Sequence, residues 1–197
     1  MGAKPCKIEI VLIKCAGYDL GYKSGVVSKD LPEDYQSKHE EGTEEYEREI
    51  KCNETIWARE DALKFKSSIY KCEEKLAKER EVNIELNYTT TGDTCTKKEA
   101  LDLIDKACEK DPGKLIIYYT GYGCRDSGNW ALTDDNIDLG DIVQTIKKAS
   151  GKVGKLYLVS DCPFAGYWLD DLHYNLKTIN KLTEYGTFSI TTSCLKE

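Results

Sequence analysis

The chain has 197 residues, of which 40% are hydrophobic and 32% are charged, and its formal net charge at pH 7 is −7. This length fits one domain with a sizeable core, and the composition excludes a disordered or low-complexity protein. The negative charge argues against a nucleic-acid surface and against a general attraction to anionic membranes. We therefore expect a single globular domain over residues 1–197 that binds neither nucleic acid nor membrane.

The cysteines indicate the cellular compartment. Nine are spread over the whole chain, and no two of them form a C-x-x-C pair. This pattern suggests neither a zinc site nor a disulfide framework, so we expect no metal and no cofactor. Several cysteines fall on apolar faces of predicted elements, where a reduced thiol behaves as a small hydrophobic side chain. Reduced thiols, and an N-terminus that reads as a strand rather than a signal peptide, are typical of a cytoplasmic protein.

The first half of the chain predicts two strands joined by a helix. Ile8–Cys15 is an apolar, β-branched run, and the polar stretch Lys23–Tyr46 that follows it is a predicted surface loop. From Trp57 to Lys78 apolar residues recur on one helical face, which predicts a crossover helix. Alternation from Val82 to Tyr88 predicts the next strand.

The second half continues the same alternation of strands and helices. Thr96 and Glu99 form a capping box that starts a helix ending near Cys108, and the apolar run Lys114–Thr120 predicts a strand that is covered on both faces. Further signals predict a short extended piece, a helix capped by Asp138 and two more strands, at Trp130–Thr133, Leu139–Lys148, Lys155–Ser160 and Gly186–Thr192. Strands alternating with helices predict an α/β fold with a mostly parallel sheet.

Two turns follow apolar strands of this predicted sheet. Gly121-Tyr122-Gly123 comes after the first strand, and a turn from Asp161 to Gly166 follows Lys155–Ser160. In parallel sheets ligands and chemistry are found beyond the carboxyl ends of neighbouring strands. The two glycines of the first turn allow a sharp change of direction that holds Tyr122 at the rim. We therefore expect the candidate site at these two turns.

The order of these motifs resembles the caspase and metacaspase family. Its members carry Gly-His-Gly after one strand and Asp-Ser-Cys or Asp-Cys-Cys after the next, whereas this chain has TGYG, GNWAL, a helix, an apolar strand, SDC and AGYW in sequence. The resemblance covers residues 5–195 and is strongest from Lys114 to Trp168. It implies a three-layer caspase-like fold, with helices on both faces of a mostly parallel sheet. It also implies that the family's smaller C-terminal segment is largely absent, because only thirty-one residues follow Gly166.

The resemblance places non-reactive residues at both catalytic positions. Tyr122 stands where the family keeps its histidine base, and a phenol with a pKa of about 10 is a poor base near neutrality. Pro163 stands where the family keeps its cysteine nucleophile, and proline lacks both a thiol and the N–H that would help to hold an oxyanion. Gly123 and Asp161 remain as a vestigial oxyanion or substrate pocket. Metacaspases bind a basic substrate side chain with the acid at the position of Asp161, although this residue is equally suited to accept turn hydrogen bonds.

The first functional hypothesis is a catalytically inactive caspase-like protein, a pseudo-protease that acts as a protein-interaction or regulatory module. Its partner would be an active caspase-like relative, or a second copy bound through an exposed sheet edge at Gly186–Thr192, where unpaired backbone groups invite another strand. The threonines and serines of this segment could instead blunt the edge. On this hypothesis the protein is not an enzyme.

Two alternatives remain. One is a cysteine-type hydrolase or endopeptidase with a displaced nucleophile at Cys162, activated by His173. Geometry argues against this alternative, because one step along an extended turn reverses the side-chain direction, so Cys162 would face away from the position of Pro163. His173 is predicted on a helix that leads away from the strand ends, and His39 lies in an acidic loop. The other is an α/β ligand-binding domain with an aromatic rim, formed by side chains that also suit a core, namely Tyr119, Tyr122, Phe164, Tyr167 and Trp168.

Overall fold

A computed structural model describes residues 6–15, 44–80, 83–92, 94–179 and 183–193. Strands and helices alternate along the chain, which confirms the predicted α/β class. The elements are β1 (Cys6–Cys15), α2 (Glu44–Arg80), β2 (Ile84–Thr90), α3 (Lys97–Cys108), β3 (Lys114–Gly123), β4 (Trp130–Ala131), β5 (Asn136–Ile137), α4 (Leu139–Lys148), β6 (Val153–Asp161), α5 (Tyr167–Ile179) and β7 (Thr183–Thr192).

The described strands form one mostly parallel sheet, as predicted. The long strands lie in the order β2, β1, β3, β6, β7, and each neighbouring pair is parallel. The short strands β4 and β5 continue from the carboxyl end of β3 as an antiparallel extension. The chain therefore moves in one direction across the sheet from β1 to β2, and in the opposite direction from β1 through β3 and β6 to β7.

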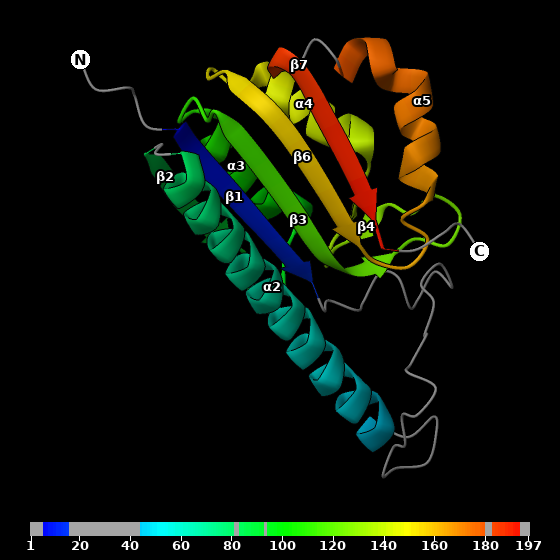
Figure 1. Ribbon diagram of the computed structural model, residues 1–197. Coiled ribbons are helices and arrows are strands. Elements are labelled where there is room, and N and C mark those ends of the chain that lie inside the picture. Colours follow the sequence, from blue (N-terminus) through cyan, green and yellow to red (C-terminus); the bar gives the residue numbers. More distant parts are fainter. Residues whose placement is uncertain (1–5, 16–43, 81–82, 93, 180–182, 194–197) are drawn as a thin grey trace.

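This order of strands determines which helix covers which face. Parallel crossovers are right-handed, so connections that run in opposite directions across a sheet lie on opposite faces. Of the described helices, α2 alone covers one face, while α3, α4 and α5 cover the other (Figure 1). The smaller core cluster lies under α2 and includes Ile10, Ile116 and Ala62. The larger cluster lies under α3, α4 and the start of α5, so the three predicted layers are confirmed.

Local sequence signals account for the starts of α3 and α4. The Glu99 amide donates to the Thr96 hydroxyl at 3.3 Å, and the Thr96 amide donates to the Glu99 carboxylate at 2.8 Å. Asp138 and Asp141 form the same reciprocal pair at the start of α4, with distances of 2.7 and 3.2 Å. Both predicted caps are confirmed, because each satisfies amides that have no partner within the helix.

The bounds of some elements differ from the prediction. The crossover helix expected from Trp57 to Lys78 spans Glu44–Arg80, so the last three residues of the predicted loop Lys23–Tyr46 are helical. The rest of that loop lies outside the described residues. Figure 1 shows the N-terminal part of α2 extending beyond the sheet. The apolar stripe marks only the part of a helix that packs on the sheet, whereas the preceding Glu-rich turns continue the helix through their own propensity.

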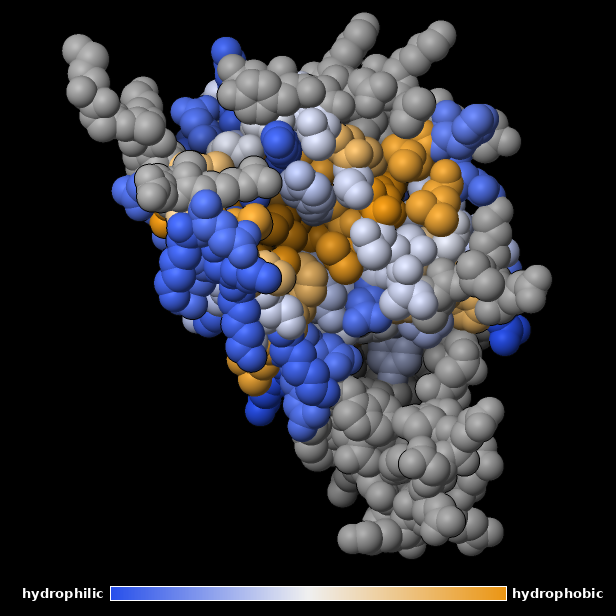
Figure 2. Space-filling model, in the orientation of Figure 1, coloured by the Kyte–Doolittle hydropathy of each residue, from blue (hydrophilic) through white to orange (hydrophobic). Residues whose placement is uncertain are grey.

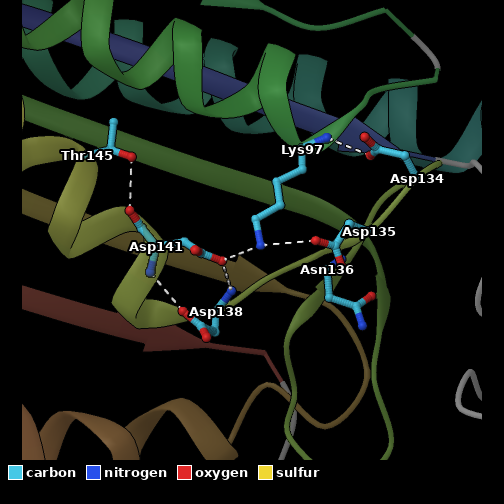
Figure 3. A network of polar contacts seen from close by, with 7 residues as sticks. All are labelled: Lys97, Asp134, Asp135, Asn136, Asp138, Asp141 and Thr145. Atoms are coloured by element: carbon cyan, nitrogen blue, oxygen red, sulfur yellow. Dashed lines mark hydrogen bonds and ion pairs between the residues drawn. The ribbon is translucent and has the colours of Figure 1, made fainter.

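A polar network joins the starts of α3 and α4 to the β4–β5 extension (Figure 3). The Lys97 ammonium lies 2.8 Å from an Asp141 carboxylate oxygen and 3.2 Å from one of Asp135. The Lys97 amide also donates to Asp134 at 2.7 Å. The hydrogen bond to Asp141 is the main reason that the pKa of Lys97 is raised above its usual value. One lysine thus holds together three acidic side chains that would otherwise repel one another.

Replacing Lys97 with methionine should therefore destabilise the fold. We expect a loss of about 1 to 2 kcal/mol, because hydrogen bonds to charged groups are stronger than neutral ones and the aspartates would lose their common cation. Urea unfolding followed by circular dichroism measures this loss. Lys98→Met is the matched control, because Lys98 is exposed and pairs only along its own helix with Asp102. Equal effects of the two substitutions would contradict a special role for Lys97.

A second ion pair lies at the amino end of the sheet. Glu9 on β1 is 1% exposed, and its carboxylate lies 2.7 Å from the Lys110 ammonium, while the Asn87 amide donates to it at 3.1 Å. A buried charge is tolerated only when such partners replace the water that it has lost. The sequence pattern does not reveal this pair, because Glu9 occupies an apolar strand and Lys110 follows a helix that is distant in the sequence.

Lys110→Met is expected to cost about 2 to 4 kcal/mol, because it leaves the Glu9 carboxylate buried with one neutral donor. The double variant Glu9→Gln with Lys110→Met should be more stable than Lys110→Met alone, since no uncompensated charge remains. Chemical denaturation of wild type, both single variants and the double variant measures the coupling. Lys75→Met removes an exposed ion pair with Glu79 and should have little effect. A double variant less stable than Lys110→Met would contradict this explanation.

Candidate functional site

The two turns singled out in the sequence lie side by side. Strands β3 and β6 pair in parallel with Thr120 opposite Asp161, so both chains leave the sheet at the same edge. Gly123 lies so close to the second turn that a side-chain Cβ at this position would overlap the carbonyl oxygen of Pro163. The absence of a side chain at Gly123 therefore allows the backbones of the two turns to come into contact.

A second glycine supports the same contact, and the sequence analysis included it only as the first residue of the GNWAL motif. Gly128 follows the first turn with φ of 63°, and a Cβ there would overlap the carbonyl oxygen of Phe164. Phe164 itself has φ of 61°, in the left-handed region that side-chain-bearing residues rarely adopt. The second turn is thus held in an unusual backbone conformation by the loop that packs against it.

Tyr122, the central residue of the first turn, is half-buried. Its carbonyl oxygen accepts a hydrogen bond from the Tyr119 hydroxyl at 2.8 Å, and the same hydroxyl lies 2.9 Å from the carbonyl oxygen of Ala131. Tyr119 is fully buried, and this burial raises the pKa of its phenol well above the usual value. The first turn is therefore anchored to the core by a neutral phenol, and its central side chain is another phenol rather than an imidazole.

Cys162, the possible surrogate nucleophile, points into the protein. Its side chain belongs to the large core cluster and is 3% exposed. The sulfur lies 3.4 Å from the Ser160 hydroxyl, which accepts a hydrogen bond from the Trp130 indole at 2.8 Å. Pro163, the next residue, is half-buried at the surface of the turn. The second turn thus presents a proline outward and keeps its thiol inward.

His173, the proposed base for this thiol, has different surroundings from it. His173 lies on α5 with an exposed side chain, whereas Cys162 is buried in the core. General-base catalysis requires hydrogen-bond reach between base and nucleophile. The different surroundings of the two side chains argue against that contact. His39 lies outside the described residues.

Alkylation of the native protein should distinguish a buried thiol from an activated one. We expect Cys162 to react with iodoacetamide at least tenfold more slowly than the exposed Cys72 at pH 7.5, because reagents reach only thiols that contact solvent. Peptide mass spectrometry after timed labelling gives both rates in one sample. Fast labelling of Cys162, with an apparent pKa clearly below about 8.5, would instead indicate an activated thiolate.

Asp161 lies on the opposite side of the sheet from Cys162, facing α2. Its carboxylate accepts a hydrogen bond from the Tyr118 hydroxyl at 2.7 Å, and Phe65 of α2 stacks on the Tyr118 ring with centroids 4.1 Å apart. The pKa of Asp61 on α2 is raised, first by burial and second by the negative charge of the nearby Asp161. Asp161 therefore contributes a negative potential at this edge of the sheet, whereas the charge of Asp61 is partly offset by the Lys64 ammonium, which lies 3.8 Å from its carboxylate.

The aromatic residues considered as a ligand-binding rim divide into two groups. Tyr119 and Trp168 are fully buried, so their assignment to a rim is wrong. Both stack on Trp130, each with ring centroids 4.7 Å apart, and large apolar rings gain most by leaving water in this way. Tyr122, Phe164 and Tyr167 are half-buried at the turns. The described pockets are elsewhere, around the start of α3, and none includes these three side chains.

The fold and the site together define a three-layer α/β protein with two contacting turns at the carboxyl ends of β3 and β6. Comparisons of the chain with protein-family models, with curated proteins and with solved structures found no match. Within the described residues, no helix combines the length and the apolar character needed to cross a bilayer.

Proposed function

We propose that this chain is a catalytically inactive protein of caspase-like architecture that acts by binding another protein. One observation carries the proposal, namely the composition of the junction between the two turns. Tyr122 and Pro163 stand at the base and nucleophile positions, and the backbone of Pro163 lies directly against Gly123. The nearest thiol, Cys162, faces the core. The two turns are in contact, while neither Tyr122 nor Pro163 supplies a group that would readily transfer a proton or attack a carbonyl.

The binding surface that we propose is the free edge of β7. Among the described strands β7 pairs only with β6 and ends the sheet. From Phe188 to Thr192 it carries no charged residue and no proline, the features that commonly protect an edge from further pairing. An extended strand of a caspase-like relative, or of a second copy, would add to this edge through main-chain hydrogen bonds.

Two measurements test the proposal. Fluorogenic peptides with Arg, Lys or Asp before the scissile bond should not be hydrolysed above the background given by Cys162→Ser. The full chain should also change the activity of an active caspase-like endopeptidase or form a dimer, and Thr191→Glu on β7 should weaken this effect. Thr90→Glu is the matched control, because Thr90 is exposed on β2 at the opposite edge. Turnover that Cys162→Ser abolishes would overturn the proposal.

A further inference from the structure

The α2 side of the sheet is covered unequally. The right-handed crossovers that place α3, α4 and α5 on one face leave α2 as the only described helix on the other. A helix is about 10 Å wide and strands are about 4.8 Å apart, so one helix covers two or three strands. α2 packs on β1, β2 and β3. Among the described elements, no helix lies over this face of β6 and β7.

The uncovered face has an apolar strip in its centre. Tyr157 and Val159 of β6 are half-buried and lie at the margin of the cluster under α2. Their partners on β7 are Ser189 and Thr191, which the pleat places on the same face. Figure 2 shows apolar surface, in orange, between blue and paler side chains on this side of the molecule. A neutral strip beside a row of hydroxyls suits a packed protein surface, and it offers no attraction to phosphate groups.

The ends of the strip carry opposite charges. Lys155 lies at its amino-terminal end, and Asp161 lies at its carboxyl-terminal end with Asp61 of α2 nearby. A helix carries a partial positive charge at its N-terminus and a partial negative charge at its C-terminus. The charges at the two ends of this face therefore favour a helix whose N-terminus lies beside Asp161. Such a helix would run in the same direction as α2 (Figure 1).

From these observations we infer that the face formed by Tyr157, Val159, Ser189 and Thr191 is a docking site for one amphipathic helix of a partner protein, parallel to α2. The helix would lay its apolar side on Tyr157 and Val159 and complete the layer that α2 begins. Thr191 borders both this face and the β7 edge, so Val159→Glu on β6, which lies away from the edge, distinguishes the two sites. The docking site does not depend on the loss of catalysis proposed above.

A library of 18-residue helical peptides, randomised on one face and displayed for selection against the full-length protein, provides the probe. Selected peptides should bind with an affinity that Val159→Glu lowers at least about tenfold, because a charge would be buried in the contact. Asp61→Lys should also weaken binding, since it reverses the charge at the helix N-terminus. Thr90→Glu on β2 should leave the affinity unchanged. Circular dichroism and urea unfolding establish that each variant is folded.

Three results would overturn the inference. Peptides selected as binders that bind Val159→Glu as well as wild type would place the contact elsewhere. A dimer of the chain that Val159→Glu dissociates, as measured by light scattering, would make a second copy the occupant. Complete resistance of the half-buried Tyr157 to tetranitromethane without any partner, under conditions that nitrate the 42% exposed Tyr88, would show that the chain covers this face itself.

Discussion

Raising the pH from 7.5 to 10 is expected to reduce the free energy of unfolding by several kcal/mol. Burial raises the pKa of the Cys95 and Cys108 thiols to about 12, and that of the Cys124 thiol to about 11. All three side chains are at most 3% exposed. In the unfolded chain a cysteine ionises with a pKa of about 8.5. The unfolded state therefore releases protons at a pH at which the folded state still holds them.

The sign of the effect follows from this difference. A pKa that is higher in the folded than in the unfolded state gives stability that is complete below about pH 8.5 and is lost as the pH rises towards 11 or 12. At pH 10 each thiol accounts for a loss of about 2 kcal/mol, and the three together approach the whole stability of a typical domain, which is about 5 to 15 kcal/mol.

Urea unfolding at several pH values between 7.5 and 10.5 measures this loss under reducing conditions. Cys108→Ala should make the pH dependence less steep, because one of the buried thiols is removed. Cys72→Ala changes an exposed thiol on α2 and should leave the pH dependence unchanged. A free energy of unfolding that stays constant up to pH 10 would contradict the expected burial of these thiols.

The predictions that succeeded rest on short-range signals. The capping residues Thr96 and Asp138 occupy the predicted helix starts, since a cap depends on only three or four neighbouring residues. The apolar run at Lys114–Thr120 is a strand buried on both faces, as a parallel sheet under helices requires. The order of such segments was sufficient for the α/β class, and the right-handed crossover rule then determines the faces.

What the sequence left open depends on contacts between distant segments. The ion pair of the buried Glu9 with Lys110 joins residues 101 positions apart, and an isolated glutamate in an apolar strand gives no sign of its partner. Trp130 was noted only within the GNWAL motif and a short extended piece, although it lies at the centre of the packing behind both turns. The position of the Cys162 thiol was anticipated from strand alternation, but its contact with Ser160 required the fold.

Replacing Trp130 with alanine is expected to destabilise the protein by about 3 to 5 kcal/mol, the usual cost of removing a large buried aromatic side chain. Trp130 is fully buried, its ring lies between those of Tyr119 and Trp168, and its indole N–H donates to Ser160 at 2.8 Å. The substitution therefore removes two ring contacts and one hydrogen bond and leaves a cavity between β3 and α5.

Thermal and urea unfolding measure the loss, and two variants divide it into its parts. Trp130→Phe keeps an aromatic ring but removes the indole donor, so it should cost less than alanine while leaving the Ser160 hydroxyl without this bond. Leu63→Ala shortens an apolar side chain that is 58% exposed on α2 and should have little effect. Because Tyr119 anchors the first turn through the carbonyl of Tyr122, Trp130→Ala should also raise the alkylation rate of Cys162. A loss below about 1 kcal/mol would mean that the stacked rings do not hold the two turns in place.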